Sequence, residues 1–270
     1  MYEILKREAL APSFYRLKVS APAVARKAQA GQFVMLMVDE VGERVPMTLV
    51  DWDTKEGSLT LAFAEVGRTT HKLARLKEGD SLAHLVGPLG RPTEIGSYGT
   101  VALVAQGYGI LALAPVARAL MEAGNRVSYL ACGPYSELAQ ENLHGFDLRC
   151  VMAEQGDGTI LGALQEVLAQ EKPARVIAQS PLCVMRLISY ATQPQGIPTR
   201  VSLNPVMVDG TGMCGSCRVR VGGQTRFACV DGPEFDGHQV DWNELLYRRC
   251  TYFAEGQPSA SFRCRNCSQW

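Results

Sequence analysis

The sequence predicts an antiparallel β-barrel, then an α/β domain built on a parallel sheet, and finally a small loop-rich module. Three observations support this fold class. Short β-rich runs fill residues 1–97, apolar runs alternate with helical patterns over residues 98–200, and six of the nine cysteines follow position 210. Closely spaced strands with turns are typical of small barrels, and alternating strands and helices are typical of parallel sheets.

The composition is that of a folded globular protein. Hydrophobic residues make up 47% of the 270 positions, and acidic and basic residues both number 27, so the formal net charge is zero. This balance gives no excess of basic residues of the kind that binds nucleic acid. The longest nearly apolar run, residues 110–121, contains Arg118 and is shorter than the ~20 residues that span a bilayer, so we expect no membrane insertion. The first eight residues lack the layout of a secretion signal, which favours a cytoplasmic location.

In the first part, predicted strands cover residues 14–19, 32–38, 47–50 and 58–63. Turn residues separate them, among them Gly31, Gly42 and Gly57. We therefore expect residues 1–97 to form the barrel domain.

In the second part, predicted strands at 101–105, 126–131, 148–152 and 175–178 alternate with predicted helices at 110–123, 136–143, 160–169 and 182–192. This order predicts a parallel sheet of the nucleotide-binding type over residues 98–200. Gly107 and Gly109 follow the first strand, where a turn can present backbone N–H groups to a phosphate.

The third part, residues 201–247, contains a cysteine motif with the spacing D-x4-C-x2-C-x11-C. Its members are Asp209, Cys214, Cys217 and Cys229. Plant-type [2Fe–2S] proteins use C-x4-C-x2-C and a later cysteine, so Asp209 stands where their first cysteine stands. Glycines between these residues allow the backbone to approach a small anionic cluster. The motif predicts a [2Fe–2S] cluster with these residues as ligands.

Zinc is the alternative for this motif, because C-x2-C pairs also build zinc sites. Such a site normally needs a second pair or closely spaced histidines, whereas His238 stands alone.

Three further cysteines in the tail, residues 248–270, have the spacing C-x13-C-x2-C and are Cys250, Cys264 and Cys267. Three cysteines are one ligand short of a tetrahedral set. Either they help to bind an additional metal or cluster, or they are incidental thiols of the tail.

The segment from Asp209 to Trp242 resembles the C-terminal signature of a family of electron-transfer flavoproteins with a ferredoxin–NADP reductase-like fold. This family includes the small subunit of NADH-dependent reduced ferredoxin:NADP oxidoreductase, the sulfhydrogenase gamma subunit and the dihydroorotate dehydrogenase electron-transfer subunit. The last of these has a cysteine where this chain has Asp209. The resemblance extends over roughly residues 1–247.

The resemblance implies that the barrel is a flavin domain that binds FAD. Two segments are similar to the family's flavin contacts, and the residues concerned are Arg44, Pro46, Met47, Thr48, Gly67, Thr69 and Thr70. In the family, the arginine meets the flavin phosphates, the following strand lies along the isoalloxazine, and the second segment cradles the pyrophosphate at the start of a helix.

The resemblance also implies a function: an FAD and iron–sulfur oxidoreductase subunit that relays electrons between NAD(P)H or a partner subunit, FAD and the [2Fe–2S] cluster. Its partners would be the catalytic and electron-transfer subunits of a larger redox complex. NAD(P)H dependence stays open, since Gln106 replaces a family glycine although Gly107 and Gly109 are retained. The alternative is a non-catalytic adaptor whose nucleotide-type domain binds no NAD(P). We find no pattern that predicts acid–base or nucleophilic catalytic residues.

Overall fold

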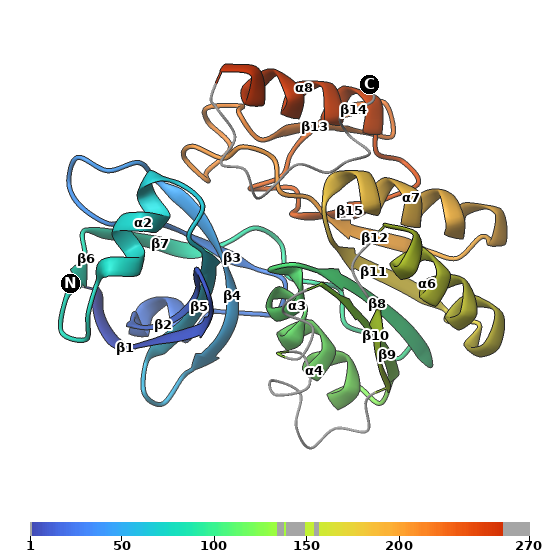
Figure 1. Cartoon of the computed structure of the whole chain (residues 1–270), viewed down its shortest axis with the longest axis horizontal. Helices are drawn as coiled ribbons and strands as arrows, with labels where there is room; N and C mark the ends of the chain where they lie inside the picture. Colours follow the sequence, from blue (N-terminus) through green and yellow to red (C-terminus); the bar gives the residue numbers. More distant parts are fainter. Residues whose placement is uncertain (1, 134–137, 139–148, 154–156, 256–270) are drawn as a thin grey trace.

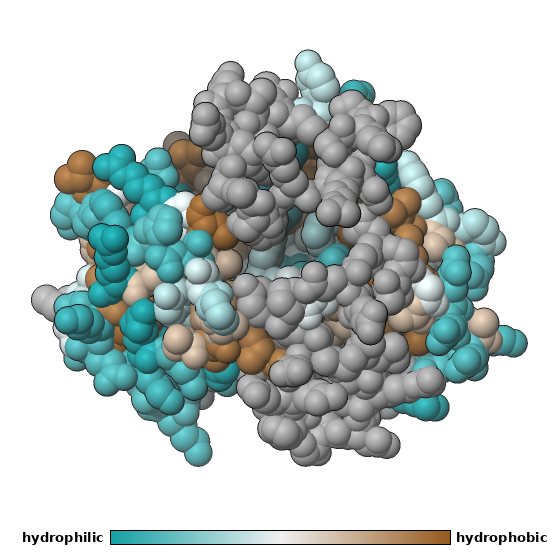
Figure 2. All heavy atoms as spheres, in the orientation of Figure 1, coloured by the Kyte–Doolittle hydropathy of each residue, from teal (hydrophilic) through white to brown (hydrophobic). Residues whose placement is uncertain are grey.

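The computed structural model describes residues 2–133, 138, 149–153 and 157–255, and Figure 1 shows the three predicted parts around a common centre. The barrel (blue to teal) lies on one side, the parallel sheet with its helices (green to yellow) on the other, and the last module (orange to red) covers the junction between them. Figure 2 shows that the outer side of the barrel is mainly hydrophilic on this face. The predicted fold class is confirmed.

The barrel is one antiparallel sheet of seven strands in the order β6-β1-β2-β5-β4-β3-β7. The strands are β1 (Tyr2–Ala11), β2 (Phe14–Ser20), β3 (Phe33–Met37), β4 (Val45–Asp53), β5 (Ser58–Ala64), β6 (Ser81–Leu82) and β7 (His84–Leu89). The two edge strands, β6 and β7, are separated in sequence only by Ala83, so the chain itself joins the edges of the sheet. Two helices accompany the strands, α1 (Pro22–Ala25) and α2 (Arg68–Arg75).

The second sheet has the order β10-β9-β8-β11-β12-β15. Its strands are β8 (Thr100–Gln106), β9 (Arg126–Cys132), β10 (Arg149–Ala153), β11 (Arg175–Gln179), β12 (Thr199–Ser202) and β15 (Glu234–Asp236). All pairs are parallel except β12 with β15. Strand β9, which follows β8 in the chain, pairs with one edge of β8, and β11 pairs with the other edge. The strand order therefore reverses between β8 and β11, and their carboxyl ends form the switch point of the sheet.

Helices cover both faces of this sheet, as Figure 1 shows. They are α3 (Gly109–Ala112), α4 (Ala114–Glu122), α6 (Asp157–Glu171), α7 (Leu182–Thr192) and the short 3-10 helix η1 (Gln193–Gln195). The expected single helix over residues 110–123 is therefore two helices. Pro115 lies at the start of α4, where a residue without an N–H begins a helix rather than continuing one. The expected helix at 136–143 lies outside the described residues apart from residue 138.

The last module contains a hairpin of β13 (Arg218–Val221) and β14 (Gln224–Phe227), followed by helix α8 (Trp242–Glu255). Its β15 extends the parallel sheet, and its core is shared with both other parts. One apolar cluster contains Phe33 and Met35 of the barrel, Val104 of β8, and Cys217 of the last module. The three parts are thus packed as one body.

The predicted domain limits 1–97, 98–200, 201–247 and 248–270 remain predictions. The limit after residue 200 falls inside β12, and the limit after residue 247 falls inside α8. Of the three cysteines that precede position 210, Cys132 and Cys183 are buried, whereas the side chain of Cys150 lies outside what the structure describes. Within the described ranges, no helix combines the length and apolar character that crossing a bilayer requires.

Candidate redox site

The cluster loop, residues 209–217, is closed by the carboxylate of Asp209. The backbone N–H of Thr211 donates to Asp209 Oδ1 at 2.8 Å, and that of Cys214 donates to Oδ2 at 2.7 Å. The hydrogen bond from Thr211 is the main reason why the pKa of Asp209 lies below its usual range. A carboxylate oxygen that accepts one hydrogen bond keeps a lone pair, so Asp209 can close the loop and still ligate a metal.

Three glycines give the cluster loop its shape. Gly210, Gly212 and Gly215 have φ values of 77°, 85° and 69°, a left-handed conformation that other residues adopt only with strain. Repeated left-handed residues in a short loop turn successive N–H groups toward one centre, which makes an anion-binding concavity.

The start of the hairpin brings two buried thiols together. Arg218 pairs with Phe227, and the N–H of Ala228 donates to the carbonyl of Cys217 at 3.1 Å. Cys217 Sγ therefore lies 3.2 Å from Cys229 Sγ, and the two are not joined in a disulfide. Burial, together with the neighbouring Cys217 thiol, raises the pKa of Cys229.

Cys214 differs from these two because it is exposed. A hydrogen bond from Ser216 is the first cause that lowers the pKa of the Cys214 thiol. Its position beside the Asp209 carboxylate completes a second pair of donors, next to the pair Cys217 and Cys229.

This donor set fits a two-iron cluster. Among the described residues, no three His, Cys, Asp or Glu side chains converge on one point closely enough to hold a single metal ion. The four predicted ligands form two pairs, Asp209 with Cys214 and Cys217 with Cys229, and a [2Fe–2S] cluster takes two protein ligands on each iron. Three thiolates and a carboxylate are also donors that iron accepts.

The first of two flavin segments, residues 44–48, runs from an exposed loop into β4. Met47 is 7% exposed and packs in the barrel core, so its neighbours Pro46 and Thr48 face the other side of the strand. Arg44 is exposed immediately before β4. A ligand on the outer side can thus contact the side chains of Arg44, Pro46 and Thr48, but only the backbone of Met47.

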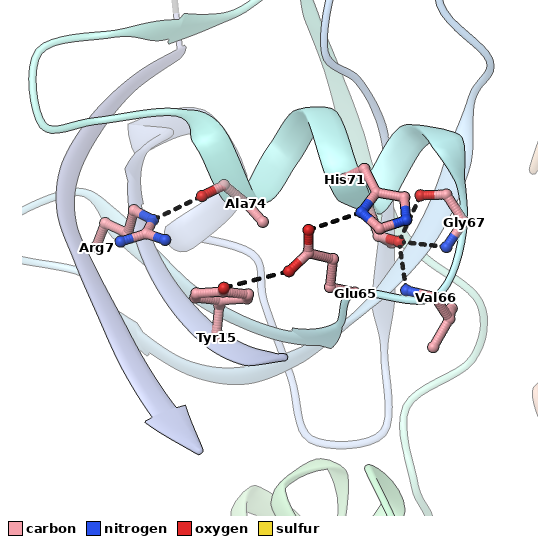
Figure 3. A network of polar contacts seen from close by, with 8 residues as sticks. Arg7, Tyr15, Glu65, Val66, Gly67, His71 and Ala74 are labelled. Atoms are coloured by element: carbon pink, nitrogen blue, oxygen red, sulfur yellow. Dashed lines mark hydrogen bonds and ion pairs between the residues drawn. The ribbon is translucent and has the colours of Figure 1, made fainter. Parts of the chain in front are cut away.

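The second flavin segment, residues 65–70, forms the start of α2 (Figure 3). Thr70 Oγ1 accepts from the N–H groups of Val66 and Gly67, each at 2.9 Å, and donates to the carbonyl of Gly67 at 3.0 Å. The Thr70 hydroxyl therefore stabilises the helix start. A Cβ on Gly67 would have no atom within 4 Å, so the helix N-terminus is open to an anion.

One contact connects the two flavin segments, and the sequence did not indicate it. Thr69 Oγ1 donates to Glu43 Oε2 at 3.4 Å, and Glu43 precedes Arg44. A second network fixes the turn before α2: His71 Nδ1 lies 2.6 Å from Glu65 Oε1, and the Tyr15 hydroxyl donates to Glu65 Oε2 at 3.2 Å (Figure 3). The contact with His71 is the first cause that lowers the pKa of Glu65.

The nucleotide turn, residues 106–109, lies at the carboxyl end of β8. Gly107 has a φ of 63° and open space where a Cβ would lie, whereas a Cβ on Gly109 would be 2.1 Å from the carbonyl oxygen of Gln179. Gly109 thus allows the first helix to pack against the end of β11, which is one role that glycine has in such turns.

Two buried polar atoms at this switch point have no partner among the described residues: Gln106 Oε1 and Ser180 Oγ. Gln106 is the last residue of β8 and Ser180 directly follows β11, and these two strands are adjacent in the sheet. In the sequence Gln106 appeared only as a departure from the family pattern, and Ser180 was not singled out. Because buried polar groups normally have hydrogen-bond partners, the two atoms indicate a place for a polar ligand.

Helix α8 supplies contacts that no sequence pattern indicated. Arg248 Nη2 donates to the carbonyl of Ser216 at 3.1 Å in the cluster loop, and Arg249 Nη1 donates to that of Asn204 at 3.3 Å. The Asn204 amide in turn donates to the hydroxyl of Tyr108 in the nucleotide turn.

Of the possible second metal site, Cys250 lies on α8 with its side chain undescribed, and Cys264 and Cys267 lie outside the described residues.

Residues 204–241, which include the cluster loop, match the family described as the iron–sulfur cluster binding domain of dihydroorotate dehydrogenase B. Over 256 residues the chain is 41% identical to a Thermotoga maritima homologue of the electron transfer subunit of dihydroorotate dehydrogenase B (NAD(+)), and the match covers 93% of this chain and 91% of that protein. The chain belongs to this family of electron transfer subunits.

Solved structures agree with this family assignment. The structure of the NADH-dependent reduced ferredoxin–NADP oxidoreductase, which was studied for flavin-based electron bifurcation, is similar with a TM-score of 0.85 and 39% identity over 96% of both chains. Phthalate dioxygenase reductase, at 18% identity and a TM-score of 0.58 over 89% of this chain and 97% of that one, shares the fold. The predicted class, an electron-transfer subunit with FAD and a [2Fe–2S] cluster that works with catalytic subunits, is confirmed at the level of the family.

Proposed function

We propose that this family member relays electrons among a reduced nicotinamide dinucleotide, FAD on the two flavin segments, a [2Fe–2S] cluster in the cluster loop, and a partner subunit. The observation that carries the proposal is one shared apolar core, which joins the paired thiols of Cys217 and Cys229 to strand β3 of the barrel. Strand β3 pairs in turn with β4, which carries part of the first flavin segment.

The flavin supplies the step between two-electron and one-electron chemistry, and the chain orients it. Arg44 and the N-terminus of α2 provide positive charge for its phosphates. Arg68 and Lys72 add to this charge, although Lys72 Nζ also lies 2.5 Å from Asp39 Oδ2. Pro46 and Thr48 would supply side chains that hold the flavin ring.

In the cluster loop, Asp209 and Cys214 would hold one iron, and Cys217 and Cys229 the other. The left-handed glycines would supply N–H groups that stabilise the negative charge of the cluster sulfides. Metal binding removes the proton of a cysteine ligand, so the buried Cys229 thiol would be a thiolate in the loaded protein.

A nicotinamide dinucleotide would enter at the carboxyl ends of β8 and β11. Ligands of open parallel sheets bind at this switch point, and the unpartnered atoms Gln106 Oε1 and Ser180 Oγ provide polar contacts there. The adaptor alternative would leave these atoms without a ligand, and electrons would then enter only from a partner subunit. The cytoplasmic location predicted from the sequence belongs to the same proposal.

The decisive experiment uses the full chain purified without oxygen. Iron, acid-labile sulfide, zinc and flavin are counted first, and NADH or NADPH is then added while the visible spectrum is recorded. We expect iron, sulfide and flavin, prompt bleaching of the flavin band by one of the two nucleotides, and subsequent loss of cluster absorption. An intact flavin that neither nucleotide bleaches would support the adaptor, and zinc in place of iron and sulfide would overturn the proposal altogether.

A further inference from the structure

The cluster loop is in direct contact with the barrel through Gly210. A Cβ on Gly210 would lie 2.5 Å from Met35 Cγ and 2.9 Å from Leu89 Cδ1, so only a glycine leaves room for these side chains. Its left-handed φ of 77° adds a second reason for glycine at this position. The loop is therefore seated on strands β3 and β7, close to the Asp209 carboxylate.

Met35 lies between this loop and the first flavin segment. It is 1% exposed on β3, and its direct partner across the sheet is Pro46 of β4. Because directly opposite residues of an antiparallel pair share one face of the sheet, the side chains of Met35 and Pro46 are neighbours. The same apolar cluster contains Met35 and the buried cysteines Cys217 and Cys229.

We propose that Met35 is a positioning residue that sets the separation between the cluster loop and the flavin segment on β4. This inference rests on the proposed function. In the transfer that it controls, one electron leaves the reduced flavin and one arrives at the cluster, and Met35 is neither oxidised nor reduced. The electronic coupling of two centres falls steeply with distance, so a loop that is seated less firmly transfers electrons more slowly.

The experiment compares Met35→Ala with Met35→Leu, which conserves the side-chain volume. The matched control is Leu120→Ala. Leu120 is 0% exposed on α4, in an apolar cluster that contains no residue of the cluster loop. All variants are loaded with FAD and cluster, the flavin is reduced rapidly with the nucleotide that bleaches it or otherwise by a light flash in the presence of an electron donor that reacts only with the excited flavin, and the rate of cluster reduction is followed.

We expect Met35→Ala to slow cluster reduction several-fold, because the electronic coupling between flavin and cluster falls as a less firmly packed cluster loop moves away from β3 and β4. Met35→Leu and Leu120→Ala should transfer electrons at the rate of the unmodified chain. In the iron-free chain, proteolysis between Asp209 and Cys214 should be faster in Met35→Ala than in Leu120→Ala. This last readout requires no loaded protein.

An unchanged transfer rate in a fully loaded Met35→Ala variant would overturn the inference, as would equal slowing in Leu120→Ala. Loss of the cluster from Met35→Ala alone would support it, since an unseated loop holds its ligands poorly, whereas equal loss from Leu120→Ala would contradict it. A chain that contains no flavin or no cluster before any substitution would instead refute the proposed function.

Discussion

The cluster loop and the nucleotide turn both contain left-handed glycines, but the surroundings of Gly210 and Gly107 differ. A Cβ on Gly210 would meet Met35 at 2.5 Å, and one on Gly212 would meet Val230 at 2.8 Å. A Cβ on Gly107 would have no atom within 4 Å. Gly210 and Gly212 of the cluster loop are thus covered by the protein itself, and the first glycine of the nucleotide turn is open.

This difference indicates two ways of holding a ligand. A loop whose outer side is packed against the barrel leaves only its inner side for a ligand, which suits a small permanent cluster. A turn with open space and unpartnered polar atoms suits a ligand that enters and leaves. The cluster loop is consequently the region where substitutions should have the largest effects.

Cys217→Ala should have the largest effect of all. Its thiol is 1% exposed and lies 3.2 Å from that of Cys229, so its removal takes one ligand from a donor set that has no described substitute. We expect the visible cluster absorption to disappear and the iron content to fall to background, with flavin retained. Iron and sulfide analysis beside the flavin spectrum measures this.

Cys183→Ala is the control, because Cys183 is a cysteine of α7 that is only 4% exposed and lies outside the cluster loop. It should keep both iron and flavin. If Cys217→Ala retained a full complement of iron, the ligand assignment would be wrong, and with it the contrast between the two regions.

The contrast could be predicted from the sequence only in part. The spacing of Asp209, Cys214 and Cys217 predicted a closed loop because ligands of one cluster must be near neighbours, and this is a local property. The contact of Gly210 with Met35 joins residues 175 positions apart, and no local pattern carries such information. The same holds for β15, a short strand that joins the parallel sheet only because the edge of β12 is free to pair with it.

The nucleotide turn was harder to interpret from the sequence for a different reason. Gln106 appeared as the loss of a family glycine, since a sequence comparison registers only the replaced residue, and Ser180 was not singled out. The fold places both at the switch point of the sheet, where their unpartnered oxygens become candidates for ligand contacts. Arg248 likewise had no signal, because its target is a backbone carbonyl that any residue provides.

Gly107→Ala sharpens the contrast with a smaller expected effect. The added methyl would enter open space at a φ of 63°, so the fold should lose about 1–2 kcal/mol from left-handed strain and little from crowding. If the turn receives the nicotinamide dinucleotide, the concentration needed for half-maximal flavin bleaching should rise by about tenfold, as expected for one misplaced methyl group.

Gly124→Ala is the matched control for this substitution. Gly124 has a φ of 84° and equally open surroundings, but it lies between α4 and β9, at the other end of the sheet. It should lose a similar free energy of unfolding and leave the bleaching curve unchanged. Identical bleaching curves for both variants would show that the open glycine of the nucleotide turn has no part in ligand binding.

The smallest expected effect concerns Glu234 of β15, which connects the last module to the segment that follows the barrel. Glu234 is 8% exposed at the start of β15 and accepts a hydrogen bond from the Thr93 hydroxyl in the segment that follows the barrel. Burial raises the pKa of this carboxyl above 4.5, the neighbouring Arg200 and Arg175 oppose the rise, and Glu94 adds to it.

This raised pKa predicts how stability depends on pH. Between the unfolded value near 4.5 and the raised folded value, the folded chain binds more protons than the unfolded chain, so rising pH removes stability. Glu234→Gln keeps an oxygen that accepts from Thr93 and has no proton to lose. Its free energy of unfolding relative to the unmodified chain should therefore increase across that window, with a slope of at most about 1.4 kcal/mol per pH unit, and stay constant above it.

Urea unfolding midpoints from about pH 5 to about pH 8 measure this difference, with Glu122→Gln, an exposed position on α4, as the control. The control should run parallel to the unmodified chain throughout. If Glu234→Gln also ran parallel, Glu234 would be ionised in the folded chain at the pH where it is ionised in the unfolded one. The carboxylate that contacts Thr93 would then be solvated in the folded chain, and water would reach the contact between β15 and the segment that follows the barrel.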